Sequence, residues 1–298
     1  MIHASSLRGC GVAIVTPFSK NGNIDEKALR KLVNFQIENG TNFIIPCGTT
    51  GESATMEADE RKQVIRIVID QTKKRVPVIA GTGTNSTASS VTYSKQAQDL
   101  GADGVLLVGP YYNKPTQEGY FQHFKAIAES ISIPAILYNV PGRTGGNMEP
   151  KTILRLAEIK NIIGVKEASA NFGQFMEILE QRSRDFLVLS GDDALTLPMM
   201  PLGADGVISV AANQIPRAMS DMVKYALDGN FVKAREIHYQ YLELMNFNFV
   251  ESNPIPVKCA LALMGLIEEN YRLPLVPLQE ANKQKMKQLL FTLKLISQ

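Results

Sequence analysis

A lysine inside an apolar, strand-like stretch is the residue of this sequence with the clearest chemical potential. The stretch reads I-I-G-V-K-E-A-S over residues 162–169 and contains Lys166. An ammonium ion is costly to bury without a partner, and desolvation lowers the pKa of a lysine until it can act as a Schiff-base nucleophile. The alternative is a lysine that extends to solvent or pairs with Glu167. Neighbours on a strand point to opposite faces, which argues against that pair.

Two polar side chains in and after the apolar run at residues 134–140 could serve the same chemistry. Tyr138 lies near the end of that run, one repeat before Lys166, so the two side chains could meet at the rim of a sheet. A phenol beside a forming carbinolamine can carry protons, although a rim tyrosine can also simply pack its ring. Arg143 follows in a loop, where its guanidinium could form two hydrogen bonds to a carboxylate. Alternatively, its side chain could be solvated.

The glycine-rich turn G-T-T-G-E-S at residues 48–53 combines hydroxyl groups with backbone N–H groups. Thr49 and Thr50 supply the hydroxyls, and a turn of this kind before a helix can hold a carboxylate or a phosphate. The turn lacks the Lys-Ser/Thr pair of a P-loop, so nucleotide binding is disfavoured.

Two other motifs carry weaker signals. Tyr111 and Tyr112 are adjacent, so on strand-like backbone they face opposite ways, and the pair could also lie in a subunit interface. The G-T-G-T-N motif at residues 81–85 predicts a turn in which Asn85 caps the following helix.

Short apolar runs rich in β-branched residues alternate with longer amphipathic segments along most of the chain. The apolar runs are residues 11–18, 42–47, 76–83, 104–110, 134–140, 162–168, 186–192 and 206–210. Their spacing suits one strand, a crossover helix and two short loops. Eight such units predict a closed (β/α)8 TIM barrel rather than a doubly wound sheet, which would need a G-x-G-x-x-G turn after the first strand.

The strand pattern stops near residue 215, and the remaining chain has the periodicity of helices. We therefore predict a barrel domain over residues 1–230 and a C-terminal helical subdomain over residues 231–298. In barrels of this kind the chemistry lies at the C-terminal ends of the strands. The polar residues and glycines singled out above concentrate at those ends.

The composition of the chain excludes several classes of partner. Its 298 residues are 45% hydrophobic and 20% charged, with 31 basic and 29 acidic side chains and a net charge of +2. This is ordinary globular composition without a block of like charge, so we expect neither nucleic acid nor membrane as a partner. We see no secretion signal at the N-terminus and expect a cytoplasmic protein.

The cysteines and histidines are too scattered to indicate a metal site. We expect free thiols and no metal or cofactor, because no pair has ligand spacing. The residues concerned are Cys10, Cys47, Cys259, His3, His123 and His238.

With these residues identified, the sequence resembles the 4-hydroxy-tetrahydrodipicolinate (dihydrodipicolinate) synthase family of class I pyruvate-dependent lyases and aldolases. The resemblance covers essentially the whole chain. The shared motifs are G-T-T-G-E-S (48–53), G-T-G-x-N (81–85), P-Y-Y-N-K-P (110–115), Y-N-V-P-G-R-T (138–144), G-V-K-E-A (164–168), S-G-D-D (190–193), G-V-I-S-V (206–210) and N-P-I-P-V-K (253–258).

The resemblance implies a catalytic role for four residues. Lys166 would form an imine with pyruvate. Thr49, Tyr138 and Tyr112 would form a proton relay, with Tyr112 reaching in from a neighbouring subunit. Members of the family are usually dimers of dimers, so the resemblance also implies a homotetramer.

The resemblance further implies a substrate site for pyruvate and L-aspartate 4-semialdehyde. Thr50 and the backbone of its turn would hold the pyruvate carboxylate, and Ile208 would contact it through its main chain. Gly191 would belong to the same site. Arg143 would bind the carboxylate of the semialdehyde at the mouth of the barrel.

Two alternative functions stay open at this point. N-acetylneuraminate lyase and 2-keto-3-deoxy sugar-acid aldolases share the lysine and the tyrosine, but Arg143 in its G-R-T context and Thr49 resemble the synthase. A second alternative is a pyruvate-binding protein that has lost turnover.

Relatives inhibited by L-lysine resemble this chain at four positions of an effector pocket: Ser53, Ala54, Asn85 and Tyr111. The chain departs from the enterobacterial pattern of two histidines and a glutamate at three others: Ala58, Arg61 and Ser89. An acidic group would hold the ammonium of the effector, and Arg61 adds a like charge. We therefore expect weak or absent feedback by lysine.

Overall fold

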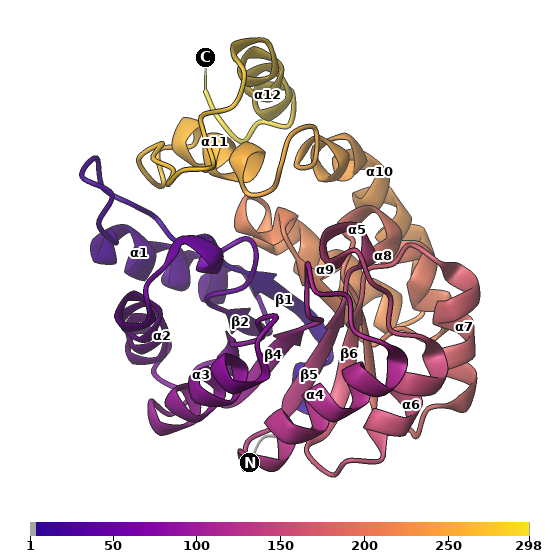
Figure 1. Ribbon diagram of the computed structural model, residues 1–298. Coiled ribbons are helices and arrows are strands. Elements are labelled where there is room, and N and C mark those ends of the chain that lie inside the picture. Colours follow the sequence, from indigo (N-terminus) through magenta and orange to yellow (C-terminus); the bar gives the residue numbers. More distant parts are fainter. Residues whose placement is uncertain (1–3, 298) are drawn as a thin grey trace.

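The computed structural model describes residues 4–297, and its strands form a barrel surrounded by helices (Figure 1). The strands are β1 (Gly9–Ala13), β2 (Phe43–Ile45), β3 (Ile79–Gly81), β4 (Gly104–Val108), β5 (Ala135–Asn139), β6 (Ile162–Glu167), β7 (Leu187–Ser190) and β8 (Gly206–Ser209). Their order in the sheet is β2-β1-β8-β7-β6-β5-β4-β3, and every neighbouring pair is parallel.

The edges of this sheet, β2 and β3, come together and close the barrel. Ile44 forms an isolated parallel bridge with Val78. The Ile44 amide donates to the Pro77 carbonyl at 3.0 Å, and the Gly81 amide donates to the Pro46 carbonyl at 2.8 Å. The predicted TIM barrel is therefore confirmed, with one strand from each apolar run.

Apolar side chains pack on both the inner and the outer face of the barrel sheet, since alternate residues of a strand point to opposite faces. The inner cluster consists of Leu7, Ala13, Phe43, Ile45, Ile79, Leu106, Ile136, Tyr138, Val140, Leu187, Leu189 and Ile208. A larger cluster joins the outer faces of the strands to the surrounding helices. Both faces are covered, which explains why the apolar runs do not alternate with polar residues.

The helices of the outer layer follow the strands in turn. They are α1 (Glu26–Glu38), α2 (Ala58–Thr72), α3 (Thr87–Asp99), α4 (Gln117–Glu129), α6 (Pro150–Ala157), α7 (Phe172–Gln181), α8 (Asp193–Met199) and α9 (Pro216–Leu227). A short helix α5 (Pro141–Thr144) and the 3-10 helices η2 (Ser53–Thr55), η3 (Met200–Leu202) and η4 (Ala211–Asn213) lie in the connections, and the 3-10 helix η1 (Ala4–Leu7) precedes β1.

Local caps fix where several of these helices begin. The Asp25 carboxylate accepts from the Ala28 amide at 2.9 Å at the start of α1. The prediction that Asn85 caps α3 is wrong, because the cap is Ser86, whose hydroxyl accepts from the Ser89 amide at 3.3 Å. Asn and Ser are about equally good caps, so adjacent candidates cannot be ranked from their types alone.

The chain after α9 forms the helices α10 (Phe231–Phe247), α11 (Ile255–Leu263) and α12 (Glu280–Thr292). The helix α10 packs against α8 and α9, and α11 packs against α12 beyond it (Figure 1). The predicted boundary after residue 230 falls between α9 and α10, and the division into two domains stays a prediction.

Two further observations concern residues 4–297 as a whole. None of their helices is long and apolar enough to cross a bilayer. The three cysteines Cys10, Cys47 and Cys259 are free, as predicted, and all three are buried. His3 lies outside the described residues.

Candidate active site

Lys166 and Tyr138 lie side by side at the C-terminal ends of adjacent strands. The parallel pairing of β5 with β6 sets Tyr138 directly opposite Lys166. Both side chains are buried, and Lys166 is only 4% exposed. The Lys166 Nζ atom lies 4.2 Å from the centre of the Tyr138 ring. The predicted meeting of these two side chains is therefore present in the structure.

Glu167 points to the other face of β6 and is occupied there. Its carboxylate accepts from the side-chain amides of Asn139 and Gln174, each at 3.0 Å, and from the Ser169 amide at 2.7 Å. Because these donors satisfy the carboxylate on the far side of the strand, Glu167 is not the partner of Lys166, as the strand geometry predicted.

The surroundings of Lys166 favour its neutral amine. Burial lowers the pKa of Lys166 to about 8, the nearby Asp193 carboxylate raises it, and the Arg143 guanidinium lowers it. With this pKa about one amine in ten is neutral at pH 7, against about one in a few thousand for a free lysine. The face of the Tyr138 ring favours the ammonium form, but burial is the larger effect.

Tyr138 keeps its proton at neutral pH. Burial raises the pKa of its phenol to about 12, while the Arg143 charge and a hydrogen bond with the Thr49 side chain lower it. A protonated phenol beside the amine can donate to a developing oxyanion and then take the proton back.

Asp193 anchors the backbone at the end of β8 and lies near enough to influence Lys166. Its Oδ2 atom accepts from the Val210 amide at 3.0 Å and from the Ala211 amide at 2.8 Å. Its Oδ1 atom has no hydrogen-bond partner within residues 4–297. Burial raises the pKa of this carboxyl. Sequence analysis did not assign Asp193 a role, although it belongs to the S-G-D-D motif.

A cavity of about 300 Å³ opens at this end of the barrel. Its wall contains Thr49, Tyr138 and Arg143 and extends to Tyr111 and Arg61. No aspartate or glutamate of the described chain lines it, although two arginines do. A low-dielectric cleft lined by one sign of charge attracts ligands of the opposite sign. The cavity therefore suits an anionic ligand.

Four predicted site residues do not line this cavity: Lys166, Thr50 and Ile208 are buried, and Gly191 is partly buried. Gly191 follows β7 and packs directly against the lysine. A Cβ atom at Gly191 would lie 3.1 Å from the Lys166 Cε atom and 2.6 Å from the Ala168 Cβ atom. The absence of a side chain at this position therefore makes room for Lys166.

The turn that carries Thr49 and Thr50 is held by distant segments. The Thr16 hydroxyl donates to the Gly51 carbonyl at 2.8 Å. The Asn253 side-chain amide donates to the Thr50 hydroxyl at 3.0 Å. One Arg143 N–H donates to the Asn253 carbonyl at 3.4 Å, so this asparagine contacts residues from both predicted carboxylate sites. Asn253 was missed as a site residue, although it begins the N-P-I-P-V-K motif.

Tyr111 and Tyr112 point in different directions, as predicted, but not because they lie on a strand. Tyr111 lines the cavity, whereas Tyr112 does not line it and is 90% exposed. The backbone of Tyr112 has φ 73°, in the left-handed region that is uncommon for such a residue. The structure therefore does not bring Tyr112 to the Tyr138 of its own chain.

The predicted effector positions are only partly brought together. Ser53, Ala54 and Tyr111 line the cavity, but Asn85 does not. Arg61 lines it too and is 7% exposed.

The Arg61 guanidinium is held by backbone and aromatic groups rather than by a carboxylate. It donates to the Ser53 carbonyl at 3.3 Å and to the Gly81 carbonyl at 3.1 Å. It lies 4.4 Å from the centre of the Tyr93 ring. Its positive charge is therefore fixed at the cavity wall.

The barrel, the buried lysine with its lowered pKa and the adjacent tyrosine are typical of enzymes that form a Schiff base with a carbonyl substrate. The sequence profile of the dihydrodipicolinate synthetase family matches residues 6–293. The chain belongs to the dihydrodipicolinate synthetase family, as its motifs predicted.

Similar proteins match this chain over most of its length. The 4-hydroxy-tetrahydrodipicolinate synthase of Chloroherpeton thalassium is 56% identical over 94% of this chain and 93% of its own. A dihydrodipicolinate synthase from Acinetobacter baumannii, described as chloride-inhibited and solved with pyruvate, is 48% identical, with a TM-score of 0.96 over 97% of this chain and 100% of its own. A monomeric dihydrodipicolinate synthase variant is 45% identical, with a TM-score of 0.96 over 98% and 99% of the two chains.

The lowered pKa of Lys166 predicts a pH dependence for imine formation. With Lys166 as the predicted nucleophile, only its neutral amine would react, so the rate should rise as pH increases through about 8 and level off above that pH. Trapping with borohydride during incubation with pyruvate, followed by intact mass, measures the rate at each pH. Arg143→Gln removes a like charge and should move the midpoint upward. A wild-type midpoint at the ordinary value for lysine would contradict the role of burial.

The contact between Gly191 and Lys166 predicts a specific loss in the Gly191→Ala variant. The added methyl group would clash with the Ala168 Cβ atom and crowd the Lys166 side chain, so kcat/KM should fall on the order of a hundredfold. Gly173→Ala, in α7, is the control, because its Cβ atom would approach only the Asn171 side chain, at 3.2 Å. Steady-state kinetics and thermal melting of both variants make the comparison, and unchanged kinetics for Gly191→Ala would show that the lysine tolerates the added methyl group.

Proposed function

We propose that this chain catalyses the 4-hydroxy-tetrahydrodipicolinate synthase reaction. It condenses pyruvate with L-aspartate 4-semialdehyde in the diaminopimelate route of L-lysine biosynthesis. The observation that carries the proposal is the buried Lys166 amine, with a pKa of about 8, beside Tyr138 at the mouth of the barrel. Membership of the dihydrodipicolinate synthetase family favours this reaction over cleavage of sugar acids.

The lysine supplies the covalent chemistry. Its neutral amine attacks the keto carbon of pyruvate, and loss of water from the carbinolamine gives an imine. Loss of a proton from the methyl carbon gives an enamine, whose carbon attacks the aldehyde. The amino group of the second substrate can then displace Lys166 and close the ring. These steps need an amine and a proton carrier, so the proposal includes no cofactor.

Proton transfer falls to Tyr138, Thr49 and Tyr112. Tyr138 and Thr49 line the same cavity. A hydrogen bond with the Thr49 side chain lowers the pKa of Tyr138, against the larger effect of burial. We assign Tyr112 to the cavity of a neighbouring subunit, because it is exposed and does not line its own.

The remaining assignments concern carboxylate recognition. Thr50 and the backbone of its turn hold the pyruvate carboxylate, with Gly191 and the main chain of Ile208 nearby. Arg143 is exposed at the cavity wall and binds the carboxylate of the semialdehyde.

The proposed assembly is a homotetramer made of two dimers, in the cytoplasm. The exposed Tyr112 supports at least a dimer, since the proton relay would otherwise be incomplete. One relative is described as a monomeric variant, so the assembly is not uniform among related proteins.

The proposal predicts a covalent pyruvate adduct on a single lysine. Incubation of the wild-type enzyme with pyruvate and borohydride should add one reduced pyruvate to Lys166, located by peptide mass. Lys166→Met should form no adduct, and its turnover should fall on the order of a thousandfold or more.

Product formation from pyruvate and L-aspartate 4-semialdehyde separates the alternatives. An adduct with cleavage of N-acetylneuraminate or a 2-keto-3-deoxy sugar acid would favour a sister aldolase. An adduct without any turnover would indicate a pyruvate-binding protein, and no adduct would refute the Schiff-base mechanism.

We also propose that L-lysine inhibits this enzyme weakly or not at all. Arg61 lines the cavity next to Ser53 and Ala54, and no acidic side chain of the described residues lines it. An effector with two ammonium groups would meet a fixed like charge there. Ala58 and Ser89, which depart from the enterobacterial pattern, add no carboxylate.

Titration of activity with L-lysine up to high millimolar concentration should therefore show little change. Sodium chloride at equal ionic strength is the control for screening. A double variant, Arg61→His with Ser89→Glu, should become more sensitive, because it removes the guanidinium and adds a carboxylate. Strong, saturating inhibition of the wild-type enzyme would refute the proposal.

A further inference from the structure

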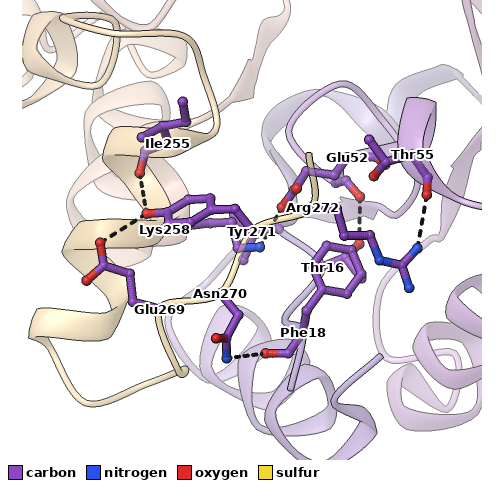
Figure 2. A network of polar contacts seen from close by, with 12 residues as sticks. Thr16, Phe18, Glu52, Thr55, Ile255, Lys258, Glu269, Asn270, Tyr271 and Arg272 are labelled. Atoms are coloured by element: carbon purple, nitrogen blue, oxygen red, sulfur yellow. Dashed lines mark hydrogen bonds and ion pairs between the residues drawn. The ribbon is translucent and has the colours of Figure 1, made fainter. Parts of the chain in front are cut away.

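The turn that carries Thr49 and Thr50 is joined to the C-terminal helices by a fully buried ion pair. Glu52 belongs to this turn, and its Oε1 atom lies 2.5 Å from the Nζ atom of Lys258 in α11. Both side chains are 0% exposed. Figure 2 shows them within a network of polar contacts between segments that are far apart in the sequence.

The ammonium group of Lys258 is enclosed by aromatic rings on the barrel and on the C-terminal segment. Its Nζ atom lies 4.5 Å from the centre of the Phe18 ring and 5.2 Å from that of Tyr271. The Tyr271 hydroxyl donates to the Ile255 carbonyl at 3.1 Å, which ties its loop to the start of α11. The lysine is therefore held in one place by its partner and by its surroundings (Figure 2).

The glutamate is held in a particular backbone conformation. Glu52 has φ 56° and ψ 34°, in the left-handed region that few residues other than glycine adopt. Its Oε2 atom has no hydrogen-bond partner within residues 4–297. Lys258 is therefore the one side chain within that range that ion-pairs with this carboxylate.

The energetics of burial argue that such a pair does more than stabilise the fold. Removing two charges from water costs free energy that their attraction often fails to recover, and apolar replacements of buried pairs are frequently as stable. What the pair supplies is a fixed distance between two segments. Here those segments are the turn beside Thr50 and the helix that follows Asn253, which donates to the Thr50 hydroxyl at 3.0 Å.

We propose that Glu52 and Lys258 are positioning residues for the pyruvate site. The pair sets the turn so that the Thr49 hydroxyl faces Tyr138 and the Thr50 hydroxyl and backbone face the keto-acid carboxylate. The C-terminal helices thereby act on substrate binding without touching the substrate. This inference rests on the proposed roles of Thr49 and Thr50.

The test replaces both charges at once. The Glu52→Met/Lys258→Met double variant replaces the pair by apolar side chains of similar size and leaves no unpaired buried charge or amide, so its melting temperature should stay close to that of the wild type. Its KM for pyruvate should nevertheless rise on the order of tenfold, and borohydride trapping should need correspondingly more pyruvate. The KM for L-aspartate 4-semialdehyde should change much less. A purely structural role would not produce this split between the two substrates.

A second variant keeps the test decisive if the double variant does not fold. Glu52→Asp retains both charges and shortens the reach of the carboxylate by one methylene group. It should raise the KM for pyruvate while leaving the protein folded. The control is Glu118→Gln/Arg155→Met, which removes an exposed ion pair of 2.6 Å on the outside of the barrel and should leave both KM values unchanged.

Two outcomes overturn the inference. One is a folded double variant, or a folded Glu52→Asp, with the wild-type KM for pyruvate. The other is an equal rise of both KM values, which would indicate a general loosening. Because trapping uses pyruvate alone, it reports on the ion pair even if the wild-type enzyme fails to turn over the semialdehyde. Failure of the proposed reaction and failure of this inference are therefore distinguishable.

Discussion

The cost of burying an ammonium ion is the physical constraint on which this site depends. Lys166 lies where the barrel gives it little water, so the neutral amine gains relative to the charged one. Asp193 opposes this effect without cancelling it. This balance matters for the proposed mechanism, in which the Lys166 amine is neutral when it attacks the keto group and carries charge once it is an iminium. A carboxylate near the reacting nitrogen suits the second requirement while burial serves the first.

The barrel converts strand pairing into the arrangement of the site. The register of β5 against β6 places Tyr138 opposite Lys166, and alternation along β6 sends Glu167 to the other face. These positions follow from backbone hydrogen bonds, so they are as rigid as the sheet itself. The cavity wall then adds positive charge from Arg61 and Arg143 without acidic side chains from the described residues. An excess of positive over negative side chains suits a site that is proposed to bind two substrates with carboxylates.

The C-terminal segment completes the site by reaching back to the first third of the chain. Asn253 contacts the Thr50 hydroxyl and receives a hydrogen bond from Arg143, and Lys258 pairs with Glu52. The helices beyond the barrel are therefore in direct contact with the turns that line the cavity, and they do more than cover its outer surface. These contacts support the proposal that the position of the turn at residues 48–53 depends on the packing of α11.

The sequence by itself determined the barrel, because eight apolar runs at the spacing of a strand and a crossover helix allow few other folds, and it determined that Lys166 and Tyr138 end adjacent strands. Its motifs also indicated the family. Only the tertiary structure decided which distant groups meet. The Glu52–Lys258 pair joins residues 206 positions apart, and neither residue type reveals its partner. The tertiary structure also decided local conformations. Ser86 caps α3 instead of Asn85, and Tyr112, whose backbone is in the left-handed region, does not line the cavity. Competing local interactions differ by less free energy than the packing that selects among them.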